Sequence, residues 1–435
     1  GDITISRNDG TSSFGEAVTL DESPVAAAVL WLGFDDGNLQ VSRDGGTSWR
    51  EVSGNVPGLP GGTYVSRVTA SHTSAGAAYA TFDAHRDGDF RPFVYRTRDF
   101  GMSWEPLHQT LPEMGMANVI VEHPDNPNTL FLGTEHHAFA STDAGANWAK
   151  IPNLPTTTYD DMVIHPREKD LVMGTHGQGV WILDDTRAIA EWAETTEPVT
   201  VFSAAVGTIK IYKKDTSYRG QEPFAGTNPV DGVDITYQIM NGSRNATLRV
   251  QRMDGTVVRE MTIPGFTGTH RVNWDLRHGG PGVSKTWARH DSPVLARSIE
   301  TWGPWVSPGK YAVIVEAGGD EGEAHVEVRG DPEMPVTQEM YEIRERFMLD
   351  TQDLAAEIQT FSQANGGGGF GRGGGMPSTA QEKAQVAGRL VQRVYQALNG
   401  GQVRPGTLYP PTQTQRGQVL EARRLFDEAR AELGR

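Results

Sequence analysis

The first 186 residues repeat one pattern of short apolar runs separated by polar turns. Each repeat begins with a β-type run, passes a short polar loop, and continues with two further apolar runs. Successive repeats lie roughly 42–52 residues apart, close to the ~40–50 residues of a four-stranded unit. The polar loops that align the repeats are Ser23-Pro24, Ser71-His72, His123-Pro124 and His165-Pro166.

The first three repeats close with one shared motif, Ser/Thr-x-Asp-x-Gly-x-x-Trp. In such a turn the Asp carboxylate can accept backbone N–H groups, the Gly adopts a positive φ, and the Trp ring packs beneath the turn. The period and the motif together predict four consecutive β-propeller blades of the Asp-box kind. We interpret the motif residues as structural rather than catalytic; they are Asp44, Trp49, Asp99, Trp104, Asp143 and Trp148.

The fourth repeat lacks this motif, because Val180-Trp181-Ile182-Leu183 runs directly into Asp184-Asp185. Propellers typically have ~4–8 blades, and an open stack of four leaves exposed sheet edges that invite association. We therefore expect the remaining blades to come from the N-terminal part of the same product or from a second chain. A self-contained ring of four blades is the alternative.

The loops between the second and third strands of each repeat are expected on the face opposite the Asp-box turns. Aligned across the repeats, they place an ionisable residue at one equivalent position: Asp35, Asp83, Glu135 and His176. Neighbouring residues in the loops add further polar groups. The predicted ligand-binding set is Asp35, Asp36, Asp83, His85, Glu135, His136 and His176.

Several interpretations of this set remain open. The loops could bind a protein or glycan ligand. Paired carboxylates, with Asp35 and Asp83 as catalytic candidates, could run glycoside hydrolysis, which needs separations of roughly 5–9.5 Å. A cluster of Asp, Glu and His could instead hold a metal ion, and the plainest alternative is a hydrated funnel mouth without chemistry. His123 and His165 each precede a proline, so we interpret them as turn residues of the opposite side.

Changes of pattern divide this mainly β chain into residues 1–192, 193–332 and 333–435. The middle region has short alternating strands, Ile209–Tyr212 among them, and turn signals such as Asn241-Gly242, which predicts an Ig-like β-sandwich. The segment Arg277–Trp305 interrupts these strands as a covering loop or a binding loop. In the last region apolar residues recur at helical spacing, and the predicted small helical tail contains a Gly-rich linker at 364–377.

Composition narrows the choice of partners. The formal net charge is −16, which argues against nucleic acid because no basic stripe would neutralise phosphates. The chain has no cysteine, so disulfides and thiolate metal sites are excluded. No run approaches the ~18 apolar residues that would suggest a transmembrane segment. We expect no cofactor, with a divalent cation as the open alternative.

Several stretches resemble the bacterial exported Asp-box propeller proteins related to sortilin, which are often labelled BNR-repeat glycosyl hydrolases. They include Asp35-Asp36-Gly37-Asn38-Leu39-Gln40, Leu130-Phe131-Leu132-Gly133-Thr134-Glu135 and Trp181-Ile182-Leu183-Asp184-Asp185. The resemblance covers nearly the whole chain. It implies the C-terminal half of a longer parent that supplies the other blades, and a periplasmic or extracellular location. One departure is Gln178, where relatives usually carry Arg, which puts an anion-binding role there in doubt.

The resemblance leaves the activity open. Sialidases with these boxes use three arginines and a Tyr–Glu pair, and we cannot assemble that set from equivalent positions here. Propellers that cut xyloglucan draw their Asp residues from two propeller domains, whereas this chain holds at most part of one. Sortilin binds peptides without catalysis. We therefore expect an exported, sortilin-like propeller that binds a protein or glycan, with a glycoside hydrolase or a structural subunit of a cell-envelope assembly as alternatives.

Overall fold

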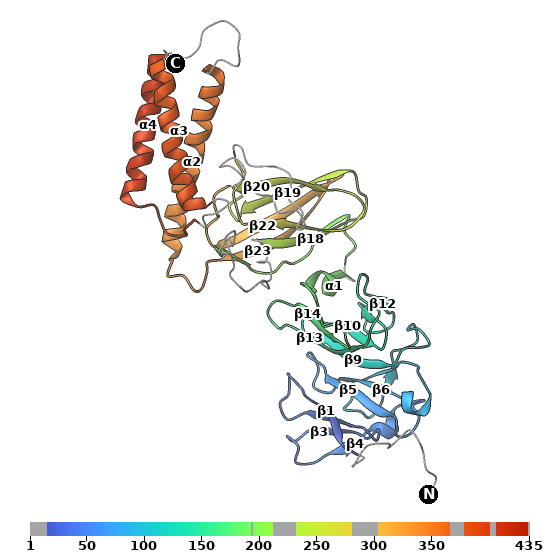
Figure 1. The fold of residues 1–435 in the computed structure, drawn as a ribbon. Coiled ribbons are helices and arrows are strands. Elements are labelled where there is room, and N and C mark those ends of the chain that lie inside the picture. Colours follow the sequence, from blue (N-terminus) through green and yellow to red (C-terminus); the bar gives the residue numbers. More distant parts are fainter. Residues whose placement is uncertain are drawn as a thin grey trace. The chain divides into compact units, whose positions relative to one another are not determined.

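The computed structural model describes residues 15–192, 195–211, 232–280, 303–365, 378–400 and 406–433. Within these ranges the chain is mainly β, with a partial β-propeller, a β-sandwich and a C-terminal helical region, as the sequence predicts. It forms two compact units, Gly1–Thr195 and Thr196–Arg435. In Figure 1 the propeller blades run from blue to green, and the C-terminal helices are orange to red.

The first unit consists of antiparallel sheets that follow one another along the chain as blades 1 to 4. Blades 1 to 3 have four strands each, and the described part of blade 4 has three. The strands are β1 (Ala17–Glu22), β2 (Leu30–Phe34), β3 (Leu39–Ser42) and β4 (Arg50–Glu51); β5 (Tyr64–Ala70), β6 (Ala78–Asp83), β7 (Phe93–Thr97) and β8 (Glu105–Pro106); β9 (Ala117–His123), β10 (Asn126–Thr134), β11 (Ala138–Ser141) and β12 (Ala149–Lys150); and β13 (Tyr159–Ile164), β14 (Leu171–Thr175) and β15 (Val180–Leu183). Short 3₁₀ turns lie at Ser53–Asn55 and His85–Asp87, and helix α1 (Arg187–Glu191) follows blade 4.

The apolar cores of this unit lie between successive blades. One cluster joins blades 1 and 2, a second joins blades 2 and 3, and a third joins blades 3 and 4. Both faces of an inner blade are therefore covered, which explains why β7 and most of β10 are buried without alternation. Members of the three clusters include Trp31 with Val68, Tyr79 with Ile120, and Phe131 with Met162.

The two end blades leave apolar side chains exposed at positions that are buried in the inner blades. The register aligns Val180 of β15 with Ala138 of β11, yet Val180 is 67% exposed and Ala138 is buried. On the first blade, Leu20 aligns with the buried Val68 and is itself exposed. Within the described residues, no further blade covers either end of the stack.

The second unit begins with a sandwich of two sheets around one shared core. Alternating buried positions along β18 turn Ile235 and Tyr237 inward, and Trp274 packs edge to face on Tyr311 across that core. One sheet orders β16 (Val199–Val201), β18 (Val233–Ile239) and β21 (Gly268–Trp274). The other orders β17 (Gly207–Thr208), β23 (Asp320–Arg329), β22 (Gly309–Ala317), β19 (Asn245–Arg252) and β20 (Val257–Pro264).

The C-terminal region contains helices α2 (Gln338–Asn365), α3 (Ser378–Asn399) and α4 (Gln413–Glu432). They pack side by side around Leu354, Val391 and Phe426 (Figure 1). Thr412 begins α4 with a capping box, because its hydroxyl accepts the Gln415 N–H and the Gln415 side chain accepts the Thr412 N–H. Among the described helices, none is long and apolar enough to span a membrane.

One predicted strand of the sandwich is wrong. The sequence predicts a strand at Ile209–Tyr212, whereas the structure has only the two-residue strand β17 just before it, paired parallel to β23. Ile209 is buried in the sandwich core, so its apolar character reflects burial and not strand pairing. Tyr212 lies outside the described residues.

Two further predictions fall largely outside the described residues. The segment Arg277–Trp305 has its ends joined by a β-bridge, with the Arg277 guanidinium 3.7 Å from the Trp305 ring centroid, and residues 281–302 between them are not described. Of the predicted Gly-rich linker at 364–377, Ala364 and Asn365 belong to the end of α2 and the rest is not described.

Candidate functional site

The strand register brings the four predicted loop residues to one equivalent position around the stack. The innermost strand of each blade carries a bulge beside this loop, and the pairing on either side of the bulge defines the alignment. On the loop side of the bulge, the first paired residue of the second strand is Phe34, Phe82, Thr134 or Thr175 in blades 1 to 4. The residue after it is Asp35, Asp83, Glu135 or His176, so these four are equivalent. We call the surface formed by these β2–β3, β6–β7, β10–β11 and β14–β15 loops the loop face.

In blade 1 the two predicted aspartates hold their own loop. Asp35 Oδ1 accepts the backbone N–H groups of Gly15 and Glu16, both at 2.8 Å. Asp36 Oδ1 accepts the N–H of Asn38 at 3.0 Å, which closes a tight side-chain turn. These oxygens are occupied by local donors, while the loop itself remains at the surface.

In blade 2 the predicted pair Asp83 and His85 forms one contact. Asp83 Oδ1 accepts the N–H of His85, and Oδ2 lies 2.7 Å from His85 Nδ1. The Asp83 side chain is mostly buried, whereas that of His85 is exposed. The imidazole is therefore the part of this pair that a ligand can reach.

Tyr64 lies beside these loops and links blades 1 and 2. Burial raises the pKa of Tyr64; nearby Asp83 and Asp35 raise it further, and Arg86 opposes them. The Arg86 guanidinium lies 5.5 Å from the Tyr64 ring centroid. A phenol, a guanidinium and two carboxylates thus lie close together at this edge of the loop face.

A second contact reaches across the inner strands of the stack. Arg67 of blade 2 pairs with Asp161 of blade 4 at 2.7 Å, passing over blade 3. Both side chains keep substantial exposure, so the pair is screened by solvent. The pair shows that blades 2 and 4 approach each other at equivalent register positions of their innermost strands.

The remaining predicted residues make looser contacts. Glu135 Oε2 and His136 Nε2 are 3.8 Å apart, and His176 Nδ1 lies 3.7 Å from Asp160 Oδ2. His176 and His136 are well exposed. The structure thus gathers Asp35 and Asp83 around Tyr64, while Glu135 and His176 stand in their own blades.

Chemically, the loop face offers hydrogen-bonding groups and both signs of charge. The two carboxylates predicted as catalytic candidates are each occupied by donors from their own blade. Within the described ranges, no group of three or more His, Asp or Glu side chains converges as a metal site would require.

Sequence reasoning missed Tyr64, Arg67, Arg86 and Asp161. Tyr64 lies directly opposite Asp83 in the β5–β6 ladder, so aligning the innermost strands as carefully as the loops would have found it. Arg67 and Asp161 share one register position in blades 2 and 4. No local pattern signals their pairing, because they are 94 residues apart in sequence.

A groove of about 400 Å³ runs along the innermost strands β1, β5, β9 and β13. Its walls combine apolar side chains such as Leu20 and Val163 with Asp21, Arg67 and His72. Burial raises the pKa of Asp21, although its carboxylate accepts the N–H groups of Ala70 and Glu22. The groove is therefore lined by all four blades, through their innermost strands and the loops that follow them.

The opposite face carries the three Asp turns that the sequence predicts as structural. In each turn the hydroxyl before the Asp donates to its Oδ1, and the residue four positions after the Asp donates both its N–H and its side chain to the same carboxylate. These hydrogen bonds lower the pKa values of Asp44 and Asp99, with Ser48 and Ser103 the main donors. For Asp143, burial raises the pKa, but the Asn147 and Ser141 hydrogen bonds outweigh it.

Two of the three Trp residues of these turns contact the preceding blade. Trp104 is 6% exposed and packs edge to face on Trp31 of blade 1. Trp148 donates its Nε1–H to Leu107 O of blade 2 at 2.7 Å. Trp49 belongs to the first blade and is 37% exposed. The same motif is therefore packed or exposed according to whether a preceding blade lies against it.

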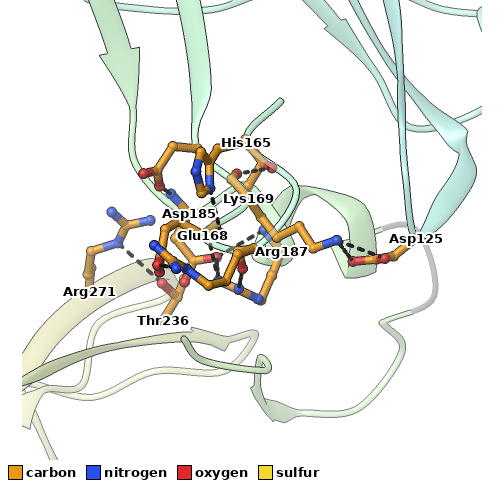
Figure 2. Close-up of polar contacts among 11 residues, drawn as sticks. Asp125, His165, Glu168, Lys169, Asp185, Arg187, Thr236 and Arg271 are labelled. Atoms are coloured by element: carbon orange, nitrogen blue, oxygen red, sulfur yellow. Dashed lines mark hydrogen bonds and ion pairs between the residues drawn. The ribbon is translucent and has the colours of Figure 1, made fainter. Parts of the chain in front are cut away.

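Blade 4 closes by a different network, shown in Figure 2. Asp185 occupies the register position of the turn aspartates, but Leu183 stands where they have Ser or Thr. Asp185 Oδ1 instead accepts Arg187 Nη1 at 2.7 Å, and Lys169 Nζ pairs with Asp125 of blade 3 (Figure 2). Both Asp185 and Lys169 have positive φ, so this closure stores some backbone strain.

The two His-Pro turns differ in environment. His123 is fully buried and its Nδ1 accepts the N–H of Asp125. Burial lowers the pKa of His123 to about 4, and Lys169 and Arg187 add to the effect against Asp125. His165 Nδ1 accepts the N–H of Glu168 at a half-buried position (Figure 2).

Comparison with known proteins gives partial similarities. No family model matches the chain. The oligoxyloglucan-reducing end-specific xyloglucanase of Emericella nidulans is 33% identical over 88 residues, which is 20% of this chain and 10% of that enzyme. The matched part thus spans about a tenth of the relative's length.

The solved structures that match this chain do so with low TM-scores and low sequence identity. YCF48 bound to D1 peptide is 12% identical at a TM-score of 0.29, covering 72% of this chain and 83% of the other. YCF48 from Cyanidioschyzon merolae is 15% identical at 0.28, covering 71% and 95%. The GH74 enzyme of Niastella koreensis is 14% identical at 0.32, covering 75% and 48%. The four blades are assigned from this chain's own sheets and register, and the comparisons leave binding and catalysis unresolved.

Proposed function

We propose that this chain is a ligand-binding β-propeller protein that holds a protein or glycan on its loop face. The observation that carries the proposal is the shared register position of Asp35, Asp83, Glu135 and His176, with Tyr64 and Arg86 beside the first two. Because each blade presents a polar group at the same register position, a ligand can make several contacts with one rigid scaffold. The other predicted members, Asp36, His85 and His136, extend the same surface.

The hydrogen bonds made by the Asp35 and Asp83 carboxylates favour ligand binding over glycoside hydrolysis. A glycosidase needs a proton-donating acid and a second carboxylate placed across the scissile bond. Asp35 Oδ1 and both oxygens of Asp83 already make contacts within their own blades, which suits carboxylates that shape a binding surface. The short similarity to a xyloglucanase keeps hydrolysis as the alternative that the experiment must address.

We also propose that further propeller blades cover the exposed ends of the stack, supplied by an earlier part of the same product or by a second chain. Leu20 on β1 and Trp49 just before β4 at one end, and Val180 and Ile182 on β15 at the other, are exposed apolar side chains. Apolar faces of this kind are normally buried against another layer. A role as an envelope subunit would use these same faces for assembly.

Membership in the sortilin-like Asp-box proteins and an exported location belong to the same proposal. They are supported by the sequence stretches quoted above and by the repeated Asp turns. Fractionation of the native cells, with an antibody against this chain, tests the location. Recovery of the protein from the cytoplasm alone would contradict export.

The binding proposal is tested by screening the whole chain against a glycan array with xyloglucan oligosaccharides and against a random peptide library. Ligands found in this way are then measured on the double variant Glu135→Ala/His176→Ala and on Glu168→Ala, a matched control in the β13–β14 loop of the opposite face. We expect at least about tenfold weaker binding for the double variant and no change for the control.

Equal binding by both variants would contradict a ligand site on the loop face. A parallel assay follows release of reducing sugar from xyloglucan oligosaccharides. Hydrolysis that is lost in both Asp35→Asn and Asp83→Asn, with folding intact, would favour the hydrolase over the binding protein.

A further inference from the structure

A small apolar pocket opens on the loop face between blades 2 and 3. Its volume is about 150 Å³. Pro92 comes from the β6–β7 loop, Leu111 and Met114 from the β8–β9 connection, and Phe139 from β11. The pocket therefore lies directly beside Glu135 and His136, at the repeated polar position of blade 3.

One aromatic residue of the pocket differs from its equivalent in the neighbouring blade. Tyr95 of β7 and Phe139 of β11 occupy the same register position. At the junction of blades 1 and 2 the Tyr95 hydroxyl donates to Pro57 O at 3.0 Å. At the next junction Phe139 has no hydroxyl, and the corresponding proline, Pro112, lines the pocket.

His137 lines the same pocket and carries a buried donor. Its Nε2 lies 3.4 Å from Lys150 Nζ, and an ammonium group can only donate, so Nε2 accepts. Burial, with Lys150 and His136 nearby, lowers the pKa of His137 and so favours the neutral ring, whose proton lies on Nδ1 when Nε2 accepts from Lys150. Nδ1 is buried and has no hydrogen-bond partner among the described residues. A buried donor without an acceptor is costly, and a ligand acceptor would relieve that cost.

The rim of the pocket is also apolar. Met114 is 67% exposed, and Phe90, whose carbonyl accepts the Gly115 N–H, is exposed beside it. Exposed Met side chains adapt to different apolar partners. Together with the pocket, Met114 and Phe90 form a continuous apolar surface at the edge of the otherwise polar loop face.

We propose that this pocket receives one apolar side chain of a protein ligand, of about Leu, Met or Phe size, and that a carbonyl of the same ligand accepts the His137 Nδ1–H. The inference rests on the proposed binding function and names its ligand class. A cavity of about 150 Å³ is below the ~300–1,000 Å³ of pockets for whole small molecules and is close to the size that holds a benzene ring.

The lining favours a side chain over a sugar. A pyranose ring carries hydroxyls on most of its carbons, and each buried hydroxyl needs a partner. The pocket offers mainly apolar walls with few donors, so a sugar would lose hydrogen bonds to water without replacing them. An aliphatic or aromatic side chain gives up no hydrogen bonds on entering.

The test uses the whole chain with ¹³C-methyl-labelled methionine, and N-acetyl-leucine N-methylamide as probe. We expect a saturable shift of the Met114 methyl signal, and little shift with N-acetyl-alanine N-methylamide. Met102, which is 59% exposed on the Asp-turn face, is the matched control and should not respond. A response of Met114 to a xyloglucan oligosaccharide but not to the leucine probe would overturn the inference, as would no response to either.

Two variants separate the pocket from the rest of the loop face. Phe139→Tyr adds the hydroxyl that Tyr95 uses at the neighbouring junction, and should weaken leucine-probe binding about 3- to 10-fold because it makes the pocket smaller and more polar. His137→Phe keeps an aromatic ring at this position, removes the donor, and should weaken leucine-probe binding about 3- to 10-fold. Thermal unfolding checks that both variants remain folded.

The outcomes also distinguish this inference from the proposed function. If a peptide selected on the whole chain loses affinity in Glu135→Ala/His176→Ala but binds Phe139→Tyr and His137→Phe normally, the pocket inference fails and the loop-face function stands. If the leucine probe binds at Met114 but no ligand depends on Glu135 and His176, the pocket stands and the proposed function fails.

Discussion

Blades 3 and 4 share one strand register but differ in what lies against them. Blade 3 has a blade on each side, whereas the described residues cover only one face of blade 4. Equivalent positions therefore have different environments, such as the buried Phe131 and the half-buried Val172. The comparison teaches that in a repeat fold the neighbouring blade decides how far a residue is buried, and so how much it contributes to stability.

The largest expected difference concerns the core. Phe131→Ala in blade 3 removes a fully buried ring between two blades and should lower the free energy of unfolding by about 3–5 kcal/mol. Val172→Ala, at the equivalent position of blade 4, should cost less than about 1 kcal/mol because one side is open. Urea unfolding of both variants checks this, and equal losses would mean that the face of blade 4 is as well packed as that of blade 3.

The next difference concerns pH and the two His-Pro turns. The pKa of His123 is about 4 in the folded chain, against about 6.5 when unfolded, so the unfolded state binds more protons between these values. Stability should therefore fall as pH decreases from about 6.5 to about 4, by roughly 1–3 kcal/mol after allowing for solvent screening.

His123→Asn keeps an acceptor for the Asp125 N–H and should flatten this pH dependence. His165→Asn makes the same exchange at the equivalent turn of blade 4 and serves as the matched control for the substitution itself. Urea unfolding at a series of pH values measures both. A slope that survives in His123→Asn would assign the pH dependence to other groups.

A smaller difference concerns how the two blades close. Asp143→Ala removes the acceptor of three donors in one turn and should cost about 1–2 kcal/mol. Asp185→Gly loses the Arg187 contact but relieves a positive φ, so its net cost should be below about 1 kcal/mol. Thermal unfolding compares them, and a larger loss for Asp185→Gly would make the network of Figure 2 the stronger closure.

The smallest effect is expected on the open face of blade 4. Val180→Thr should change the stability of this chain by no more than about 0.5 kcal/mol, because the side chain is exposed. In an assembly where another blade covers this face, the same variant should weaken the association measurably by analytical ultracentrifugation. An association unaffected by Val180→Thr would place the contact elsewhere.

The sequence by itself determined the blades, their order and the turns that close them. An Asp turn is built from residues within a few positions of one another, as Ser42, Asp44 and Ser48 illustrate, so its chemistry is readable in a short window. Register followed from the same repeats, because each blade spaces its strands and loops alike. The aligned positions Asp35, Asp83, Glu135 and His176 are therefore readable from the repeats alone.

Only the tertiary structure decided what surrounds each of these residues. Trp49 and Trp104 belong to the same motif, yet one is exposed and the other buried, because burial depends on a blade tens of residues away. The Arg67–Asp161 pair and the pocket beside His137 likewise arise where separate blades meet. Local pattern fixes turns and strand order because these need only nearby residues, while burial, charge pairing and pockets depend on how whole blades pack.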